Sequence, residues 1–479
     1  MKKRKRKKHI HHTAYELDKA FSREVEGFIK FKVSDFGELR SRLLRDLSIE
    51  YYAVLLGKHE QIGGYQFINI YDQRFLERSD YGNQSGAFLR IKKEFIHKIL
   101  IELTNRYDVD SVVDVHTHPF CSTHVGFSGV DDGDEIEFAR FLDQTFESLH
   151  YGSIVLSQTE YSARIWNSQE RPIFSEGALI KTQTLSESVS SSDFAPATAP
   201  NYPTGSPDIF NRSALALGLD TMRNIMSGQV ISIVGVGGLG SVIAEHLIHM
   251  GFHHINLIDH DILEISNLNR VVGATYDDAL KHGQKVDIVR RHLEEINPRA
   301  KVAAFANDIH DRNIEEVVAL SDWVIVATDN HSSRFRVQQL SAKYFVPMIS
   351  VGVNISAQDG QIEDMSGEVI TARIGDNICL NCLGRINPTK VANETHPDEA
   401  VKEELVKRGY VTGAHVKEPA VKTLNSILAT MAVDSLINQY TKRQRHTPIL
   451  VYEDNLSKSI YEDRESVQMR NKNCFTCNI

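Results

Sequence analysis

The chain has 479 residues, of which 41% are hydrophobic and 24% are charged, and its formal net charge at pH 7 is -9. This length exceeds one ordinary domain and suits two or three, each able to bury a core. The composition is typical of a soluble globular protein, and no apolar run approaches the ~20 residues of a membrane span. The negative charge argues against nucleic acid as a general partner.

The amino-terminal end is strongly basic, with seven Lys and Arg residues among the first eight. No apolar segment follows, so these residues do not form a signal peptide, and we expect a solvated basic tail over residues 1–14. Contact with nucleic acid or with a membrane surface is the alternative for this tail. In the absence of export and membrane signals, we expect a cytoplasmic protein.

The first predicted domain, residues 15–175, has a mixed α/β pattern. Apolar runs of strand length predict strands, and helical periodicity predicts helices, the first of them with Ser34 as its N-cap. The expected strands are 28–33, 51–56, 65–71, 111–116, 153–156 and 161–166, and the expected helices are 34–47, 90–106 and 132–148. Residues 176–207, rich in Ser, Thr, Pro and Ala, are predicted to form a linker.

The second predicted domain, residues 208–479, alternates strands and helices. The expected strands are 230–234, 254–259, 323–328 and 347–353, and the expected helices are 240–250 and 284–296. This alternation predicts a mostly parallel, doubly wound sheet with helices on both faces.

The most specific motif of the first domain pairs two histidines with a carboxylate. His116 and His118 lie two residues apart on a predicted strand, and Asp131 follows at the start of a helix. Residues i and i+2 of a strand share a face, so both imidazoles are placed to bind one metal ion. Two histidines and one carboxylate leave one zinc position open to water, as a hydrolytic site requires.

The sequence H-x-H-P followed by S-x-x-D, with a glutamate ahead of an apolar strand, resembles the JAMM/MPN family of zinc isopeptidases over most of the first domain. The resemblance implies that His116, His118 and Asp131 bind a catalytic Zn²⁺. It also implies that Glu50 moves the protons of the attacking water and that Ser128 hydrogen-bonds the developing oxyanion.

The spacing of the motif departs from the family in one respect. The segment between His118 and Asp131 is longer than usual, and the additional residues lie in 121–127. Asp132 and Asp134 are alternative carboxylate ligands, although only Asp131 fits S-x-x-D. His124 is either a stray ligand or an exposed loop histidine.

A glycine-rich turn opens the second domain. Gly235, Gly237, Gly238 and Gly240 follow the strand predicted at 230–234, and this arrangement alone is a generic dinucleotide fingerprint. Asp259 ends the next predicted strand, so binding of NAD is not excluded by this test. No G-x-x-x-x-G-K-[ST] motif occurs, so a P-loop ATPase is not indicated.

Residues downstream of the turn favour a nucleoside triphosphate. Arginine, asparagine and lysine near a glycine-rich turn suit a triphosphate better than a dinucleotide. The ordered set consists of Asp259, Asp261, Asn267, Arg270, Lys285 and Asp329. Together with the turn, it resembles the ubiquitin-activating superfamily over residues 208–479, with the layout of bacterial molybdopterin-synthase adenylyltransferase and ThiF enzymes.

That resemblance implies roles for the individual residues. Asp259 binds the ATP ribose, and Asn267, Arg270 and Lys285 hold the phosphates and neutralise the charge that develops on them. Asp329 binds Mg²⁺ near the attacked α-phosphate. The pair at 211–212 resembles a segment that donates an arginine across a homodimer, so Arg212 is expected to act in trans.

Cysteine usage indicates a second metal site. Of the five cysteines, Cys379, Cys382, Cys474 and Cys477 form two C-x-x-C pairs, which predict a structural four-thiolate zinc site. Only Cys121 remains, and the segment 387–419, where the family would place a thioester-forming cysteine, has none. We therefore expect the reaction of this chain to stop at the acyl-adenylate, with Cys121 as an alternative acceptor.

These observations favour a bifunctional enzyme. One domain is expected to cleave after the C-terminal glycine of a ubiquitin-like protein, and the other to adenylate that glycine with MgATP. The alternatives are activation of a sulfur carrier for cofactor or cysteine synthesis, and an inactive recognition scaffold. The expected partners are the carrier, a conjugating enzyme or a sulfurtransferase, and a second copy of the chain. Family analogy suggests a bacterial antiviral conjugation system as one setting.

Overall fold

The computed structural model divides into two compact units, Met1–Asn201 and Tyr202–Ile479. The residues that it describes are 27–85, 89–121, 125–146, 148–158, 160–166, 179–182, 209–218, 221–222, 225, 229–358, 361–373, 375–396, 398, 400–401, 404, 420–455 and 457–477. The expected basic tail and most of the expected linker lie outside them. None of the described helices is both long and apolar enough to cross a membrane.

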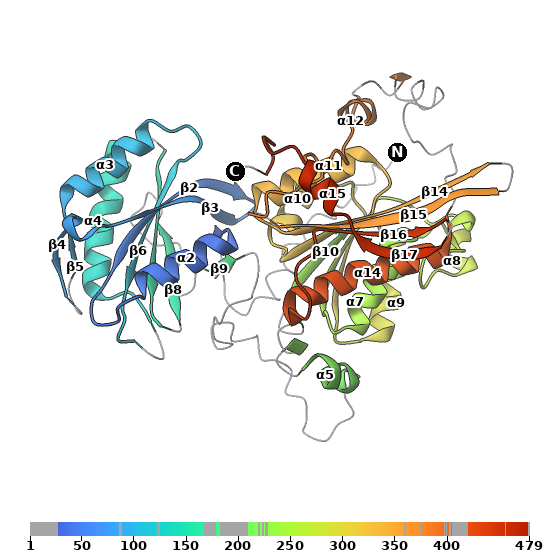
Figure 1. Ribbon diagram of the computed structural model, residues 1–479, viewed down its shortest axis with the longest axis horizontal. Helices are drawn as coiled ribbons and strands as arrows, with labels where there is room; N and C mark the ends of the chain where they lie inside the picture. The colour runs from blue at the N-terminus through green and yellow to red at the C-terminus, as the bar shows by residue number, and fades with distance from the viewer. Residues whose placement is uncertain are drawn as a thin grey trace, which may run out of the picture. The chain divides into compact units, whose positions relative to one another are not determined.

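The N-terminal unit is built on a seven-stranded mixed sheet with the order β8-β7-β6-β2-β3-β1-β9 (Figure 1). Its strands are β1 (Gly27–Phe31), β2 (Tyr52–Ile62), β3 (Tyr65–Phe75), β6 (Ser111–Thr117), β7 (His150–Leu156), β8 (Tyr161–Trp166) and β9 (Leu179–Thr182). A separate hairpin pairs β4 (Tyr81–Gln84) with β5 (Leu89–Ile91). β9 falls within the segment expected to be linker, and it pairs in parallel with β1, so the first sheet extends beyond residue 175.

Helices cover both faces of this sheet because its central strands are apolar on both sides. On β2, Ala53 and Leu55 belong to the core beneath α2 (Val33–Leu43), whereas Val54 and Leu56 belong to the core beneath α3 (Lys93–Thr104) and α4 (Gly129–Thr145). The expected Ser34 cap is wrong, since Lys32 is the N-cap residue of α2 and makes no side-chain capping bond.

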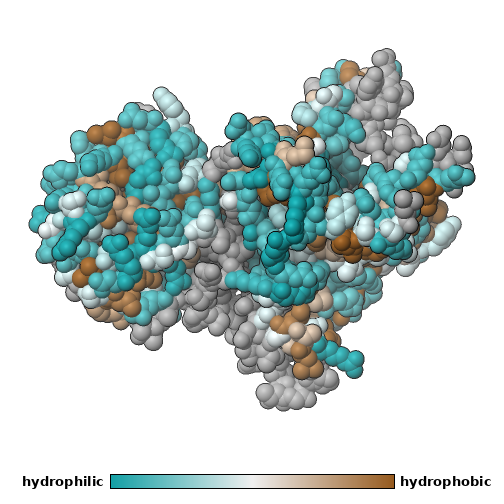
Figure 2. Space-filling model, viewed as in Figure 1, coloured by the Kyte–Doolittle hydropathy of each residue, from teal (hydrophilic) through white to brown (hydrophobic). Residues whose placement is uncertain are grey.

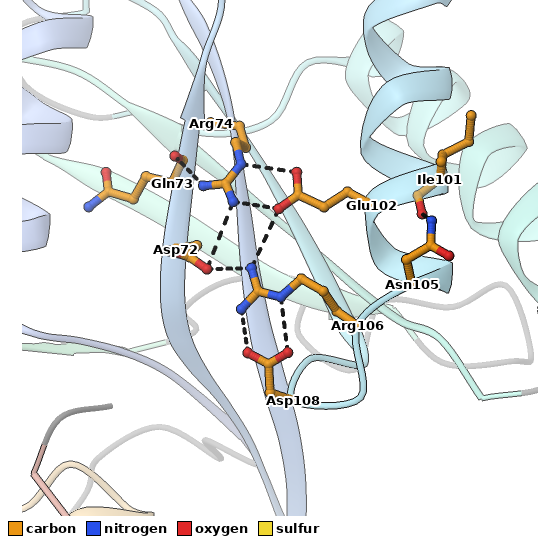
Figure 3. A network of polar contacts seen from close by, with 8 residues as sticks. All are labelled: Asp72, Gln73, Arg74, Ile101, Glu102, Asn105, Arg106 and Asp108. Carbon is orange, nitrogen blue, oxygen red and sulfur yellow. Dashed lines mark hydrogen bonds and ion pairs between the residues drawn. The ribbon is translucent and has the colours of Figure 1, made fainter. Parts of the chain in front are cut away.

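A network of charged side chains fastens the end of α3 to β3 (Figure 3). Arg74 of β3 forms an ion pair with Glu102 of α3, with its Nε 3.1 Å from Glu102 Oε2. Arg106 pairs with Asp72 of β3 and with Asp108. These pairs are partly solvent-exposed, so they fix the orientation of α3 more than they stabilise the fold.

The C-terminal unit is built on an eight-stranded sheet with the order β12-β11-β10-β13-β14-β15-β16-β17. The first five strands are parallel, and the last three add antiparallel pairings. The strands are β10 (Val230–Val234), β11 (His254–Ile258), β12 (Lys301–Phe305), β13 (Trp323–Val326), β14 (Met348–Gln358), β15 (Gln361–Ala372), β16 (Ile449–Asp454) and β17 (Lys458–Glu462). This order confirms the predicted doubly wound sheet, with its switch point between β10 and β13.

Helices pack on both faces of the parallel part (Figure 1). Ile231 and Ile233 of β10 join a core with α7 (Gly240–His249), α9 (Lys285–Ile296) and α14 (Lys422–Thr441). Ser232 points the other way and bonds to Ser321, which follows α10 (Arg312–Ala319) beside α11 (His331–Lys343). The shorter helices are α5 (Asn211–Leu217), α8 (Tyr276–Leu280), α12 (Pro388–Glu394), α15 (Arg464–Met469) and the 3₁₀ turns η1 (Arg78–Asp80) and η2 (Ile265–Asn267).

Hydrophilic side chains cover most of the visible surface of each unit, and apolar side chains appear there as separate spots (Figure 2). Tyr107, Leu215, Met469 and Phe475 are among the most exposed large apolar residues. Scattered exposed apolar side chains of this kind are normal for a folded domain.

Candidate functional sites

The first site lies where β6 ends beneath the first turn of α4. His116 belongs to β6, His118 follows it, and both alternate onto the face of the sheet that α4 covers. His116 Nε2 lies 3.4 Å from Asp131 Oδ1, and His118 Nε2 lies 3.7 Å from Asp131 Oδ2. One ligand atom from each residue lies within 4.8 Å of the others, so the structure brings together the three expected metal ligands.

Asp131 is held in place by a capping box at the start of α4. Ser128 is the N-cap residue, and its Oγ accepts a hydrogen bond from the Asp131 N–H at 3.2 Å. The Ser128 N–H donates in return to Asp131 Oδ2 at 2.5 Å. Burial acts to raise the pKa of the Asp131 carboxyl, but His116 and Ser128 outweigh burial and hold that pKa below its ordinary value.

The donor set fits a zinc ion. His116 Nε2 is buried and makes no hydrogen bond to the described residues, which is costly unless another group binds it. Burial lowers the pKa of His118, which favours the neutral imidazole that binds metals. The site offers two imidazole nitrogens and one carboxylate, and two of these residues are partly exposed. Catalytic zinc sites with an open position use this ligand set.

Glu50 lies beside these ligands although it is distant in sequence. β2 and β6 pair with Tyr52 opposite His116, and the Thr117 N–H donates to the Tyr51 carbonyl. Continuing this register places Glu50 opposite His118, on the same face. Burial raises the pKa of Glu50, and the nearby His116 partly offsets that effect.

The alternative carboxylates have other environments. Asp132 Oδ1 accepts a hydrogen bond from Arg164 Nη1 at 2.6 Å, and Asp134 is exposed. Neither belongs to the group of ligand atoms around His116 and His118. His124, the other residue considered as a ligand, lies outside the described residues.

The second site is the glycine-rich turn between β10 and α7. Gly235 has φ +88°, and a Cβ there would lie 2.9 Å from the Ala327 carbonyl oxygen. A Cβ on Gly240 would lie 1.8 Å from the Gly235 carbonyl oxygen, and one on Gly238 would lie 2.7 Å from Arg270 Cδ. A Cβ on Gly237 would meet no atom of the described residues within 4 Å, its chain neighbours aside. The turn therefore needs glycine for its own packing at three positions and is open at the fourth.

Asp259 holds this turn from the end of β11. Its Oδ2 accepts a hydrogen bond from the Val236 N–H at 2.7 Å, and its Oδ1 accepts one from the Asp261 N–H at 2.9 Å. Burial raises the pKa of Asp259, and the charge of Lys285 opposes that shift. Lys285 is itself buried and binds Asp261 Oδ2 through its Nζ at 2.7 Å. The expected ribose ligand thus also organises the loop.

Arg270 lies over the turn, and Asn267 supports the segment that carries Arg270. Asn267 is buried, and its Oδ1 accepts the Glu264 N–H, while Arg270 Nη1 donates to the Ser266 carbonyl at 2.8 Å. Asn425 of α14 was missed by sequence reasoning, yet its Nδ2 lies 2.7 Å from the position of a Cβ on Gly238. Asn425 is one of many polar residues in α14, so no sequence signal distinguished it.

Asp329 follows β13 at the same edge of the sheet. It is exposed, and the preceding Thr328 lies 2.9 Å from the Cβ position of Gly235, so Asp329 is close to the glycine turn. Arg334 of α11, which sequence reasoning also missed, donates two hydrogen bonds to the Thr328 carbonyl at 3.1 and 2.9 Å. Arg212 is exposed on α5, and its role across a homodimer stays a prediction.

The four paired cysteines converge on one point. Their sulfur atoms lie within 4.8 Å of one another, and the Cys379–Cys474 sulfur separation of 3.6 Å is too long for a disulfide. Hydrogen bonds from the Cys379 and Cys477 thiols lower the pKa of Cys382, favouring the thiolate that binds zinc. Four thiolates form a closed site, which suits a structural metal that ties the C-terminal segment to the unit.

The ThiF family model matches residues 210–476, which is more than half of the chain, and the chain therefore belongs to the ThiF family. The expected resemblance of the C-terminal unit is confirmed by this match. The resemblance of the N-terminal unit to the JAMM/MPN family stays a prediction.

Several curated proteins are similar to the chain. It is 31% identical over 181 residues to molybdopterin-synthase adenylyltransferase of Escherichia coli, and the match covers 37% of this chain and 68% of that protein. It is 30% identical over 151 residues to sulfur carrier protein ThiS adenylyltransferase of Bacillus subtilis, a match that covers 32% of this chain and 42% of that protein. The SAMP-activating enzyme E1 of Haloferax volcanii is 28% identical over 167 residues, covering 35% and 57%. The match thus spans less than two thirds of the latter two relatives.

Among solved structures, E. coli MccB in complex with AMPCPP and MccA is similar to the chain with a TM-score of 0.45. The sequences are 18% identical, and the similarity covers 58% of this chain and 76% of that one.

Proposed function

We propose that the C-terminal unit adenylates the C-terminal carboxylate of a small carrier protein. The observation that carries the proposal is the glycine turn held by Asp259, with Arg270, Lys285 and Asp329 around it. Membership of the ThiF family supports it, since related adenylyltransferases act on sulfur carriers according to their names.

In the proposed reaction a carboxylate oxygen of the carrier attacks the α-phosphorus of ATP. The new bond is an acyl-phosphate bond, the bond between the α- and β-phosphates breaks, and pyrophosphate leaves. Backbone N–H groups at the N-terminus of α7 bind phosphate oxygens, and Arg270 and Lys285 neutralise the charge of the departing pyrophosphate. Asp329 would hold Mg²⁺, which, when bound, supplies positive charge to the phosphates.

The relatives change the order of preference among the possible carriers. The sequence alone placed a ubiquitin-like conjugation cycle first. One of the similar proteins, sulfur carrier protein ThiS adenylyltransferase, has a sulfur carrier in its name. We therefore propose a sulfur carrier, or a ubiquitin-like protein that receives sulfur, as the preferred substrate, with a sulfurtransferase as partner.

The acyl-adenylate is proposed to pass to another protein. Four of the five cysteines converge on the predicted zinc site, and the segment 387–419 contains none. The C-terminal unit therefore has no cysteine outside the predicted zinc site that could act as a nucleophile. A sulfur donor, or the thiol of a partner, is left to attack the acyl carbon and release AMP.

We propose further that the N-terminal unit hydrolyses the peptide or isopeptide bond after the carrier's terminal glycine. His116, His118 and Asp131, whose ligand atoms lie close together, would hold Zn²⁺, which, when bound, polarises the scissile carbonyl and acidifies water. Glu50 accepts a proton from the attacking water and passes it to the leaving amine. The Ser128 hydroxyl donates to the oxyanion, because its oxygen accepts from Asp131 and leaves the proton available.

Exchange of radioactive pyrophosphate into ATP tests the first proposal. The full chain is assayed with candidate carriers that end in glycine, both sulfur carriers and ubiquitin-like proteins, and with Asp329→Ala as the control. Exchange that requires one carrier and disappears in the variant is the expected result. Absence of exchange with every carrier, in protein that binds ATP, would favour the scaffold hypothesis.

A further inference from the structure

The geometry of the first site depends on how α4 is docked. His116 lies in β6, and His118 is the first residue after that strand. The third ligand, Asp131, comes from the first turn of α4. The buried residues of α4 are Glu135, Ala139 and Leu142, so its apolar anchors lie in its second half. Something other than apolar packing must fix the turn that carries Asp131.

Arg164 of β8 supplies such a fixing contact. Its Nε donates to Glu135 Oε2 at 2.7 Å, and its Nη1 donates to Asp132 Oδ1 at 2.6 Å. The Arg164 side chain is 7% exposed and the Glu135 side chain is 5% exposed, so this pair is shielded from solvent. Glu135 Oε2 also accepts a hydrogen bond from Trp166 Nε1 at 2.7 Å, which fixes the carboxylate from the same strand.

The same guanidinium also reaches the histidine side of the site. It stacks over the ring of Phe127, 3.7 Å from the ring centroid. The Phe127 ring in turn approaches the His116 ring edge-on, with the centroids 6.2 Å apart at 61°. Arg164 therefore touches the helix that carries Asp131 and the residue that packs against His116.

We propose that Arg164 is a positioning residue for the metal site. The inference rests on the proposed hydrolase function and deepens it. Asp132 and Glu135 are three residues apart on one face of α4, so a planar guanidinium that binds both fixes the height and the rotation of the first turn. A lysine ammonium is a point charge and lacks the planar fork that holds both carboxylates in this geometry.

The test compares Arg164→Lys and Arg164→Gln with the unmodified full chain. Arg164→Gln leaves Glu135 buried without its charged partner and is expected to disturb folding, whereas Arg164→Lys keeps the positive charge. Co²⁺ is titrated into metal-free protein in competition with a chelator, and the visible ligand-field spectrum of bound Co²⁺ is recorded. The cysteine site is saturated with metal first, and its spectrum is subtracted. The remaining signal then reports Co²⁺ bound at the histidine site.

Arg74→Lys is the matched control, because Arg74 joins β3 to α3 through Glu102 in a similar ionic network away from the ligands (Figure 3). We expect Arg164→Lys to weaken Co²⁺ binding at the histidine site about 10-fold to 100-fold and to change the spectrum, as loss of a supporting contact does at other metal sites. Arg74→Lys is expected to retain the affinity and spectrum of the unmodified chain.

The outcomes separate this proposal from the proposed function. Unchanged Co²⁺ affinity and spectrum in folded Arg164→Lys would overturn the positioning role while leaving the metal site intact. Equal losses in Arg164→Lys and Arg74→Lys would also overturn it, since they would indicate general loosening of the unit. If His116→Ala binds Co²⁺ as the unmodified chain does, the histidines do not hold the metal. That result would overturn the metal site and the positioning role together.

Discussion

Ser128 and Asp131 cap each other at the start of α4, each donating its backbone N–H to the side chain of the other. The contact begins the helix and also aims the carboxylate of Asp131 toward His116 and His118. A local helix signal and a proposed metal ligand are therefore the same residue. The stability of the first turn and the chemistry of the site are therefore coupled through this one contact.

Ser128→Ala should affect both properties to different degrees. Loss of the capping oxygen is expected to cost about 1 kcal/mol of the free energy of unfolding of the N-terminal unit. Loss of the hydroxyl donor is expected to lower the rate of carrier cleavage about 100-fold. Ser128→Thr, which keeps a capping hydroxyl, should preserve stability. Equal cleavage rates in Ser128→Ala and the unmodified chain would remove Ser128 from the proposed mechanism.

Glu50→Gln should separate metal binding from hydrolysis. Glu50 precedes β2, close enough to His116 and Asp131 to feel their charges, and is not one of the three grouped ligands. We expect the variant to bind zinc as the unmodified chain does and to cleave a carrier precursor at least about 100-fold more slowly, because the proton acceptor is lost. Metal content and cleavage by mass spectrometry measure the two effects, and a loss of zinc would instead make Glu50 a ligand.

The glycine-rich turn allows a paired test of fold and ligand. A Cβ on Gly240 would lie 1.8 Å from a backbone oxygen, so Gly240→Ala should destabilise the C-terminal unit by about 3 kcal/mol or more. The methyl group of Gly237→Ala meets no atom of the described residues within 4 Å beyond its chain neighbours, so this variant should keep the melting temperature of the unmodified chain. Its methyl group is expected to enter the space proposed for the phosphates and to raise the KM for ATP about tenfold in pyrophosphate exchange. Normal ATP use by Gly237→Ala would place the phosphates elsewhere.

The four-cysteine cluster should bind one zinc ion that stabilises the C-terminal unit. Cys474→Ser removes a buried ligand of the cluster and is expected to lower its zinc content and its melting temperature, since binding of structural zinc contributes directly to folding. Cys121→Ser is the control, because Cys121 belongs to the other unit. If chelators fail to lower the melting temperature of the C-terminal unit, the cluster does not hold a structural metal.

The sequence predicted those elements whose signal is local. The strands at 161–166 and 230–234 were predicted with the observed bounds, because each is an uninterrupted strand-like run between breaks. β2 was predicted too short because its second half is a run of mostly polar residues, which pairing with β3 nevertheless holds in the sheet. The helix expected from residue 90 begins at Lys93, because β5 pairs with β4 just before it.

The same division applies to the candidate sites. Motif spacing was enough to select His116, His118, Asp131 and the paired cysteines, which the structure brings together. Arg164, Arg334 and Asn425 were not selected, because their contacts come from distant segments and no motif marks them. Residues that support a site from neighbouring strands or helices need the tertiary structure to be found.

A histidine pair at the opposite end of β2 should make the N-terminal unit sensitive to acid. The rings of His59 and His150 stack with their centroids 3.6 Å apart, and the backbone N–H of His59 donates to Asp110 Oδ1 at 2.7 Å. Burial, followed by the charge of His59, lowers the pKa of His150 to about 4, and burial lowers the pKa of His59. Both rings are therefore neutral in the folded unit at neutral pH.

In the unfolded chain these histidines bind protons near pH 6.5, so between that pH and about 4 the unfolded state binds more protons than the folded one. The contribution of this pair to the free energy of unfolding is therefore fully present above pH 6.5, and it is lost as the pH falls through this window. We expect the free energy of unfolding of the N-terminal unit to fall by about 1 kcal/mol more in the unmodified chain than in His150→Gln between pH 7.5 and 5, allowing for solvent screening. Exposed His97 provides the control variant, His97→Gln, and urea unfolding at each pH is the measurement. Parallel pH profiles for His150→Gln and the unmodified chain would show that the stacked pair does not titrate in this window.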